Sequence, residues 1–157
     1  MRKPATQSFW IVLFLVLPIA ALDQVTALWA RYHVPRFHEI WLWRPTLGLQ
    51  LLFNRGAALG LGSHWPFLVT VVGIVGTLVL FYLSLTAKTL RIPLAVMAGG
   101  ALGNVLSRIL FGTVTDFIRI GGWPGIFNLA DVAIRLGGVW LVIKVLIGAR
   151  NSDTSKA

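Results

Sequence analysis

Cysteine is absent from this sequence, and acidic residues are rare. The absence of cysteine excludes disulfide bonds, thiol nucleophiles and cysteine-ligated metal sites. The three histidines lie outside the apolar runs and lack the i, i+4 spacing of a zinc-binding helix, so we expect no metal site and no cofactor. The 14 lysines and arginines give a net charge of +9 but stand singly between apolar runs, so we do not expect nucleic acid binding.

Charge of either sign is scarce for a chain of 157 residues. Charged residues make up 12% and hydrophobic residues 57% of the sequence, and the mean hydropathy is +0.80. Because a soluble domain carries about 25% charged residues, this composition indicates an integral membrane protein. We expect residues 1–157 to form a single integral membrane domain. Its predicted spans, each near the length of about 20 residues that crosses a bilayer, are 9–30, 66–86, 93–115 and 127–147.

Between the first two spans lies a substantial extramembrane segment, residues 31–65. Within it, apolar residues alternate with small or polar ones over Thr46–Phe53, which predicts a β-strand. Residues 116–126 are expected to form a short loop, and residues 149–157 a disordered tail. The predicted fold class is an all-α membrane protein with four transmembrane helices and a small extracytoplasmic sheet or loop subdomain. Four spans put both termini on one side, and the basic N-terminal tail and the tight Lys88–Arg91 turn favour the cytoplasm.

Three of the five acidic residues lie in or at the ends of the apolar runs: Asp23, Asp116 and Asp131. Carboxylates at such positions are costly and are expected to face the interior of a helix bundle. At a helical rise of about 1.5 Å per residue, all three fall in the outer part of the membrane, with Asp116 at the outer end of the third span. The competing interpretation is that they are independent polar residues that snorkel or pair with arginines.

Asp116 and Asp131 are the predicted catalytic pair. Two facing carboxylates cannot both ionise easily, so such a pair keeps one proton over a broad pH range. The ionised member then takes a proton from water while the protonated member donates to the carbonyl oxygen of an amide. Serine schemes are weaker, because Ser63 and His64 are adjacent in sequence and Ser107 has no lysine or histidine in its span. The sequence therefore predicts an intramembrane aspartic peptidase.

Two pairs of polar residues have the spacing of one helix face: Asn104 with Arg108, and Asn128 with Asp131. For the two asparagines, interhelical hydrogen bonds that hold the bundle together are the alternative to a functional role. Arg108 lies in mid-span and needs a partner, either a buried carboxylate or the backbone of a bound peptide. Arg135 follows Asp131 by four residues, and we expect it to pair with Asp131 or with Asp23 at a similar depth.

Several ordered motifs resemble those of the lipoprotein signal peptidase (signal peptidase II) family. They cover almost the whole chain and are Asp23-Gln24, Asn54-Arg55-Gly56-Ala57-Ala58, Gly99-Gly100-Ala101-Leu102-Gly103-Asn104, Val114-Thr115-Asp116-Phe117-Ile118 and Phe127-Asn128-Leu129-Ala130-Asp131. The resemblance implies an aspartic dyad at Asp116 and Asp131. It also implies contacts to peptide or inhibitor from Asn54, Asn104, Arg108 and Asn128. Apart from what the resemblance implies, we expect Asp23, Gly56 and Arg135 to be supporting residues.

The resemblance also implies the partners and the location. The substrate is the signal peptide of a prolipoprotein whose next residue is a diacylglyceryl-modified cysteine, and membrane lipid surrounds the enzyme. Peptide antibiotics of the globomycin type are expected to bind. The location is the bacterial inner (cytoplasmic) membrane, crossed several times, with the active site toward the outer face.

Three positions depart from the family pattern. Leu59 stands where the family usually has phenylalanine. Ser107 stands where the family has aspartate, and Ala27 stands where it has lysine. The missing charges have opposite sign, which is consistent with the loss of a partner pair. Two alternatives therefore stay open beside the peptidase: a weakly active or inactive paralogue that binds lipoproteins or lipid, and a proton or ion pathway. Against the pathway, the inner halves of the spans lack ionisable groups except Lys144.

Overall fold

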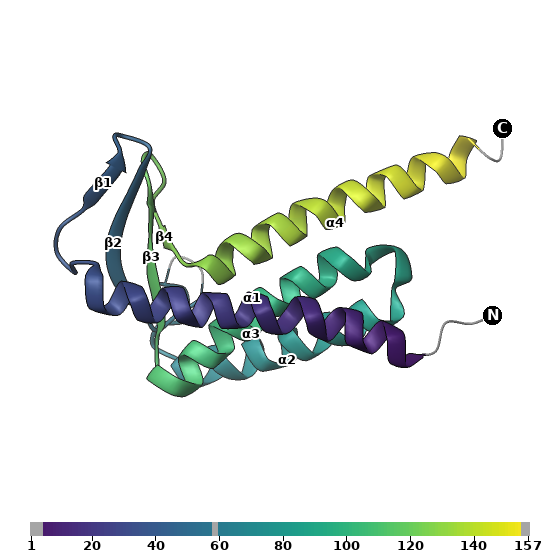
Figure 1. The fold of residues 1–157 in the computed structure, drawn as a ribbon, viewed down its shortest axis with the longest axis horizontal. Helices are drawn as coiled ribbons and strands as arrows, with labels where there is room; N and C mark the ends of the chain where they lie inside the picture. The colour runs from purple at the N-terminus through teal and green to yellow at the C-terminus, as the bar shows by residue number, and fades with distance from the viewer. Residues whose placement is uncertain (1–4, 58–59, 155–157) are drawn as a thin grey trace.

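Four long helices and a small antiparallel sheet make up the computed structural model, which describes residues 5–57 and 60–154 (Figure 1). The helices are α1 (Ala5–His33), α2 (Pro66–Thr86), α3 (Arg91–Phe111) and α4 (Leu129–Thr154), with a short 3-10 helix, η2 (Lys88–Leu90), before α3. The strands are β1 (Ile40–Trp43), β2 (Leu47–Asn54), β3 (Val114–Ile120) and β4 (Ile126–Phe127). Within the described part, four helical stretches are long and apolar enough to cross a membrane: Thr6–His33, Pro66–Thr86, Lys88–Phe111 and Leu129–Ala149. The predicted fold class is confirmed.

Helix α3 is the centre of the bundle and packs against α1, α2 and α4. Three of its glycines allow this close approach. A Cβ atom added at Gly99 would lie 2.9 Å from Ile19 Cβ of α1, and one at Gly100 would lie 2.5 Å from the carbonyl oxygen of Ala130 in α4. These glycines give α3 a small-residue face that packs on two sides, against α1 and against α4.

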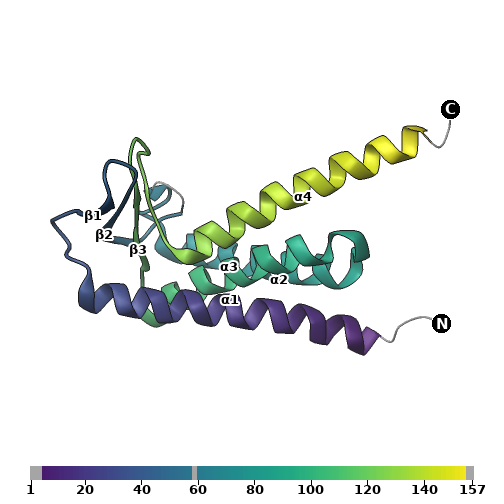
Figure 2. The ribbon, with the colours of Figure 1, turned by 45° about the horizontal axis from the view of Figure 1, so that its top comes forward.

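Helix α4 packs on α3 near its start and then diverges from the other helices (Figures 1 and 2). Gly137 still approaches α3 closely, since a Cβ there would lie 2.6 Å from Met97 Cγ. Farther along, α4 exposes large apolar side chains, among them Val142, Ile143 and Leu146. Such a surface suits contact with lipid chains.

The sheet lies at the end of the bundle where α1 ends and α4 begins, opposite the start of α1 and the end of α4 (Figure 1). Its strand order is β1-β2-β3-β4, all antiparallel. β2 pairs with β3 in a register that places Leu52 opposite Asp116 and Asn54 opposite Val114. Ala30 at the end of α1 packs against Phe117 of β3, which anchors the sheet on the bundle.

The prediction for residues 93–126 was wrong in two respects. Helix α3 ends at Phe111 rather than near residue 115, because Gly112 adopts the left-handed conformation (φ 70°) that closes a helix. Residues 116–126, predicted as a loop, contribute most of β3 and the start of β4. Asp116 therefore lies on a strand beyond the helix end.

The prediction for the fourth span was wrong at its C-terminal end. The helix begins at Leu129, close to the expected start, but it continues to Thr154. The part of the tail that the structure describes, residues 149–154, is therefore helical rather than disordered.

Candidate active site

A cavity of about 890 Å³ lies between the sheet and the adjoining ends of α3 and α4. Both predicted catalytic aspartates line it. Among its other lining residues are Asn54, Asn104, Arg108, Arg119 and Arg135. The structure therefore brings to one cavity side chains that are spread over more than 80 positions of the sequence.

Asp116 reaches this cavity from β3 and is almost completely buried. Both of its carboxylate oxygens accept hydrogen bonds: Oδ1 from Asn128 Nδ2 at 2.9 Å, and Oδ2 from Asn54 Nδ2 at 3.2 Å. Burial, followed by the negative charge of Asp131, raises the pKa of Asp116 to about 7. The two asparagine hydrogen bonds and the charge of Arg108 act in the opposite direction but are outweighed. Asp116 therefore keeps its proton up to near-neutral pH.

Asp131 reaches the cavity from the first turn of α4. Asn128 caps this turn, because its Oδ1 accepts a hydrogen bond from the Asp131 backbone N–H at 2.7 Å. Asn104 Nδ2 donates to Asp131 Oδ1 at 3.0 Å, and Asn104 Oδ1 accepts from Asn128 Nδ2 at 2.9 Å. Two amides thus form a chain between the Asp131 and Asp116 carboxylates. Within the described part of the chain, Asp131 Oδ2 has no hydrogen-bond partner.

Asp23 lies next to this site but not in the cavity lining. Its carboxylate is buried, and Oδ1 accepts a hydrogen bond from the Ala130 backbone N–H at 2.8 Å. Gln24 Nε2 donates to Asp23 Oδ2 at 3.0 Å and also lies 3.0 Å from Ser107 Oγ. As the sequence predicts, the three carboxylates converge at one end of the bundle. Asp23 acts there on the backbone that precedes Asp131.

Of the three positions that depart from the family pattern, Ser107 and Ala27 are buried inside the bundle, and Leu59 lies outside the described residues. Ser107 is engaged by Gln24, so the hydroxyl has a polar partner where the family has a carboxylate. Ala27 belongs to the buried hydrophobic residues of α1. Neither position contributes to the cavity lining.

Arg108 finds its partners in the backbone. Nη2 donates to the Gly56 carbonyl oxygen at 2.6 Å and Nη1 to the Asn104 carbonyl oxygen at 3.1 Å, while the buried Nε has no partner in the described part of the chain. Gly56 cannot be replaced easily, because a Cβ there would lie 2.6 Å from the backbone of Gly60. Asn54 Oδ1 accepts from the Gly56 N–H at 2.9 Å, which holds the same turn.

The predicted ion pair of Arg135 is not formed. Among the described side chains, Arg135 has no carboxylate within 4.0 Å, neither Asp131 nor Asp23. Its guanidinium carbon lies 4.0 Å from the centroid of the Phe127 ring and 6.0 Å from that of Trp123. A cation–π contact takes the place of the salt bridge.

Two further arginines that the sequence analysis missed, Arg55 and Arg119, also line the cavity. Arg119 Nε lies 3.5 Å from Glu39 Oε1, an ion pair that joins β3 to the segment before β1. The signal for Arg119 was present, because Val114–Ile120 is rich in β-branched residues and predicts a strand. Because residues 114–115 were assigned to the end of the third span and residues 116–120 to a loop, the strand and the position of Arg119 on it were not predicted.

Asp116 keeps its proton up to near-neutral pH, and Asp131, which lines the same cavity, has one carboxylate oxygen without a hydrogen-bond partner among the described residues. Placed at the ends of membrane-length helices, this arrangement defines an intramembrane aspartic peptidase. Comparison with known proteins gives the family: residues 15–147 match the model described as Signal peptidase (SPase) II. The chain belongs to the signal peptidase II family. This membership does not favour the ion-pathway and inactive-paralogue alternatives.

Relatives and solved structures agree with this family. A lipoprotein signal peptidase of Rhodococcus jostii is 31% identical over 98% of this chain and 82% of its own length. That of Burkholderia thailandensis is 35% identical over 91% and 90%. A solved structure described as a bacterial membrane enzyme has a TM-score of 0.76 and 25% identity, covering 97% of this chain and 92% of its own. The family and the fold thus extend over nearly the full chain.

Proposed function

We propose that this protein cuts the signal peptide from lipid-modified bacterial prolipoproteins, with Asp116 and Asp131 as the catalytic pair. The observation that carries the proposal is the shared cavity in which one aspartate is buried and protonated and the other retains a free carboxylate oxygen. The lipoprotein signal peptidase names of the relatives support the substrate class.

In this mechanism Asp131 is the ionised member. Its free Oδ2 takes a proton from a water molecule, whose oxygen attacks the carbonyl carbon of the scissile amide. Asp116 donates its proton to the carbonyl oxygen and stabilises the tetrahedral intermediate. When the C–N bond breaks, the proton gained by Asp131 passes to the leaving amine, and Asp116 recovers its own from the hydroxyl of the new carboxylic acid.

The asparagines Asn54, Asn104 and Asn128 orient the two carboxylates. Asn54 and Asn104 also line the cavity and can contact the substrate, whereas Asn128 is buried behind the lining. Each donates to a carboxylate oxygen, which fixes the side-chain angle of both aspartates. Arg108 lines the cavity and has an Nε–H without an acceptor among the described residues, so it is suited to donate to a peptide carbonyl oxygen. A cyclic peptide antibiotic of the globomycin type would block the cavity through the same donors.

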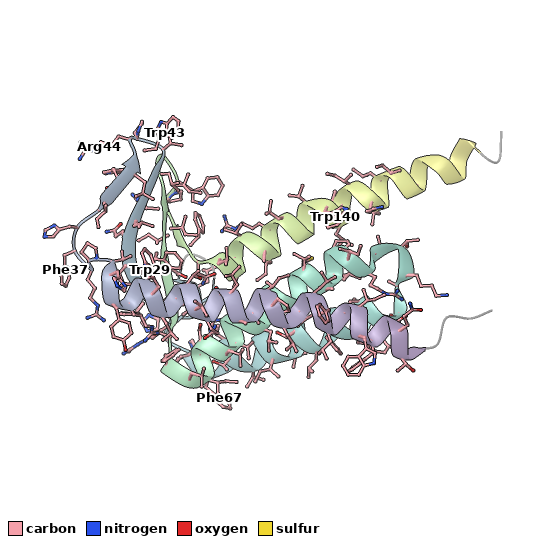
Figure 3. The ribbon with its side chains drawn as sticks, viewed as in Figure 1. Trp29, Phe37, Trp43, Arg44, Phe67 and Trp140 are labelled. Carbon is pink, nitrogen blue, oxygen red and sulfur yellow. The ribbon has the colours of Figure 1, made fainter. Side chains whose placement is uncertain are left out.

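We place the protein in the bacterial inner membrane, with both termini in the cytoplasm and the cavity toward the outer face. Support comes from the fold, since the start of α1 and the end of α4 lie together at the end opposite the sheet (Figure 1). Lys88 and Arg91, in the tight turn before α3, lie toward the same end. Exposed aromatic side chains such as Phe37 and Trp43 gather instead at the sheet end, where they suit a membrane surface (Figure 3).

The test is cleavage of a diacylglyceryl-modified prolipoprotein by the purified protein in lipid vesicles. The parent should release the signal peptide, seen as a mobility shift of the mature lipoprotein. Asp116→Asn and Asp131→Asn keep the shape of each side chain but remove the acid or the base, so each should reduce turnover by about 10²–10⁴-fold or more. A parent that does not cut refutes the activity, and a variant with normal turnover refutes the dyad.

A further inference from the structure

Arg135 is a charged side chain in a membrane-length helix that the proposed mechanism leaves without a task. In the described structure it pairs with no carboxylate, and it lines the cavity that contains Asp116 and Asp131. Arg135 lies in the second turn of α4 and its side chain is exposed, so a molecule that enters the cavity can reach the guanidinium. Its partner is therefore expected to enter the cavity from outside.

The guanidinium has a fixed platform. It lies over the ring of Phe127, which is buried and belongs to β4, paired with Ile118 of β3. Stacking on an aromatic face leaves the N–H groups at the edge of the planar guanidinium free to donate. Arg135 therefore presents a preoriented pair of donors to the cavity.

The side chain also points in a defined direction. Residues of a helix lean toward its N-terminus, and Arg135 reaches back from the second turn of α4 to Phe127 and Trp123, which precede that helix. In the proposed orientation, its charged end therefore lies at the outer, water-facing side of Asp131. The part of a substrate that leaves the site in this direction is the polypeptide after the lipid-modified cysteine, because the signal peptide lies in the membrane.

The charge of the cavity favours an anion there. Four arginines line it against two aspartates, and burial raises the pKa of one of these, Asp116, to about 7, so that it carries only part of a negative charge at neutral pH. Arg108 is engaged by backbone carbonyls and Arg119 by Glu39, whereas the contacts of Arg135 with other described residues are to aromatic rings. A carboxylate that meets Arg135 can accept two parallel hydrogen bonds from it.

We propose that Arg135 is a specificity-determining residue that binds an aspartate or glutamate side chain within the first two residues after the modified cysteine of the substrate. This inference rests on the proposed function and adds a substrate preference to it. An anionic phospholipid headgroup has the same charge, but it is not anchored beside the scissile bond.

The test compares two lipid-modified substrates that differ only in aspartate or asparagine at the second residue after the cysteine. The parent should have a kcat/KM for the aspartate substrate about tenfold higher than for the asparagine substrate, and added salt should reduce this ratio. In Arg135→Gln the ratio should fall to near one. Arg44→Gln is the matched control, because Arg44 is an exposed arginine at the tip of the sheet, away from the cavity lining (Figure 3). It should retain the ratio.

Three results overturn the inference. They are a parent ratio near one, a ratio that survives in Arg135→Gln, and an equal loss in Arg44→Gln. A parent ratio near one, with an Arg135→Gln variant that responds less to anionic phospholipid in the vesicles, assigns the arginine to a headgroup instead. If the parent cuts neither substrate, the proposed function fails, and the dissociation constants of the same two peptides must still differ about tenfold for the inference to stand.

Discussion

The two aspartates of the cavity differ in how many of their oxygens are satisfied. Both oxygens of Asp116 accept asparagine hydrogen bonds in a buried setting, whereas Asp131 keeps one oxygen free. The buried residue is therefore suited to hold the proton, and the other to polarise water. This assignment has a consequence for pH dependence.

Activity should fall as the pH rises through about 7. The pKa of Asp116 is raised to about 7, so the acid is present below that pH and is lost above it, when both carboxylates are ionised. The measurement is the pH profile of kcat/KM on one lipid-modified substrate. A profile that is flat from pH 6 to pH 9 would contradict the assignment of Asp116 as the acid.

Asn54→Ala should move this alkaline limb to higher pH. The hydrogen bond from Asn54 lowers the pKa of Asp116, so its removal lets the pKa rise further. The turnover rate will also fall, because Asn54 holds the turn at Gly56 and Ala57. The position of the alkaline limb, however, reports on the pKa of the Asp116 carboxyl group alone. Gln50→Ala on the same strand is the control, and a limb that moves equally in both variants would refute the effect.

At the level of single residues, the sequence alone predicted the two aspartates and the asparagines that contact them. Their rarity in apolar runs and their motif spacing were sufficient. It did not predict the partner of Arg135, because i, i+4 spacing favoured Asp131, whereas the ring of Phe127 reaches the guanidinium only once β4 is placed beside β3. The Gly56 carbonyl partner of Arg108 could not be predicted either, because it comes from a turn that is distant in the sequence.

Two side chains, one from the residue just before α4 and one from α1, hold the start of α4 by hydrogen bonds to its backbone N–H groups. Asn128 caps it from within, and Asp23 of α1 accepts the N–H of Ala130 from outside. Negative charge at this end also suits the helix dipole. The position of Asp131 in the cavity therefore depends on a contact between the first and the last helix.

Asp23→Ala should lower both the melting temperature and kcat. Loss of a capping acceptor costs about 1–2 kcal/mol, and a shift of about 1 Å in Asp131 can reduce turnover about 10²-fold. Asp23→Asn retains an acceptor oxygen and should be affected less. Thermal unfolding and single-substrate kinetics give both quantities. A moved alkaline limb with unchanged melting would instead assign Asp23 to the acid–base chemistry.

Gly100→Ala should separate α3 from α4. The new Cβ would lie 2.5 Å from the Ala130 carbonyl oxygen, so one helix must shift, at a cost of about 1–3 kcal/mol. Gly138→Ala is the matched control in α4, because nothing lies within 4 Å of a Cβ at that position. We expect loss of activity and a lower melting temperature in Gly100→Ala only. Equal behaviour of the two variants would mean that the helices are not in tight contact there.

Among the elements, the four helices and strand β2 were predictable from apolar run length and alternation. Strand β3 was missed although its β-branched residues favour a strand, because Val114 and Thr115 continue the apolar run of α3 and conceal the boundary at Gly112. β4, of two residues, pairs with β3 and has no periodic signal of its own. A strand this short, which exists because it pairs with another strand, cannot be predicted from the local sequence pattern.

For the molecule as a whole, the sequence predicted that three carboxylates share one end of the bundle, and the structure confirms this convergence. It did not predict the divergence of α4 from the other helices (Figure 2). Helices α3 and α4 approach closely at Gly100 and Gly137, whereas a Cβ added at Gly148, farther along α4, would meet no atom within 4 Å among the described residues. The angle between two helices depends on the side chains of both helices, so the divergence of α4 could not be predicted from its own sequence.

The position of the cavity at the ends of membrane-length helices has a kinetic consequence. A substrate anchored in the same bilayer reaches the enzyme by lateral diffusion, so its effective concentration is a mole fraction in the lipid rather than a molarity in water. Diluting the membrane with inert lipid, at constant enzyme and substrate, should therefore slow cleavage in proportion to the added surface. Initial rates in vesicles of increasing lipid content measure this, and a rate independent of lipid content would mean that the substrate arrives from the aqueous phase.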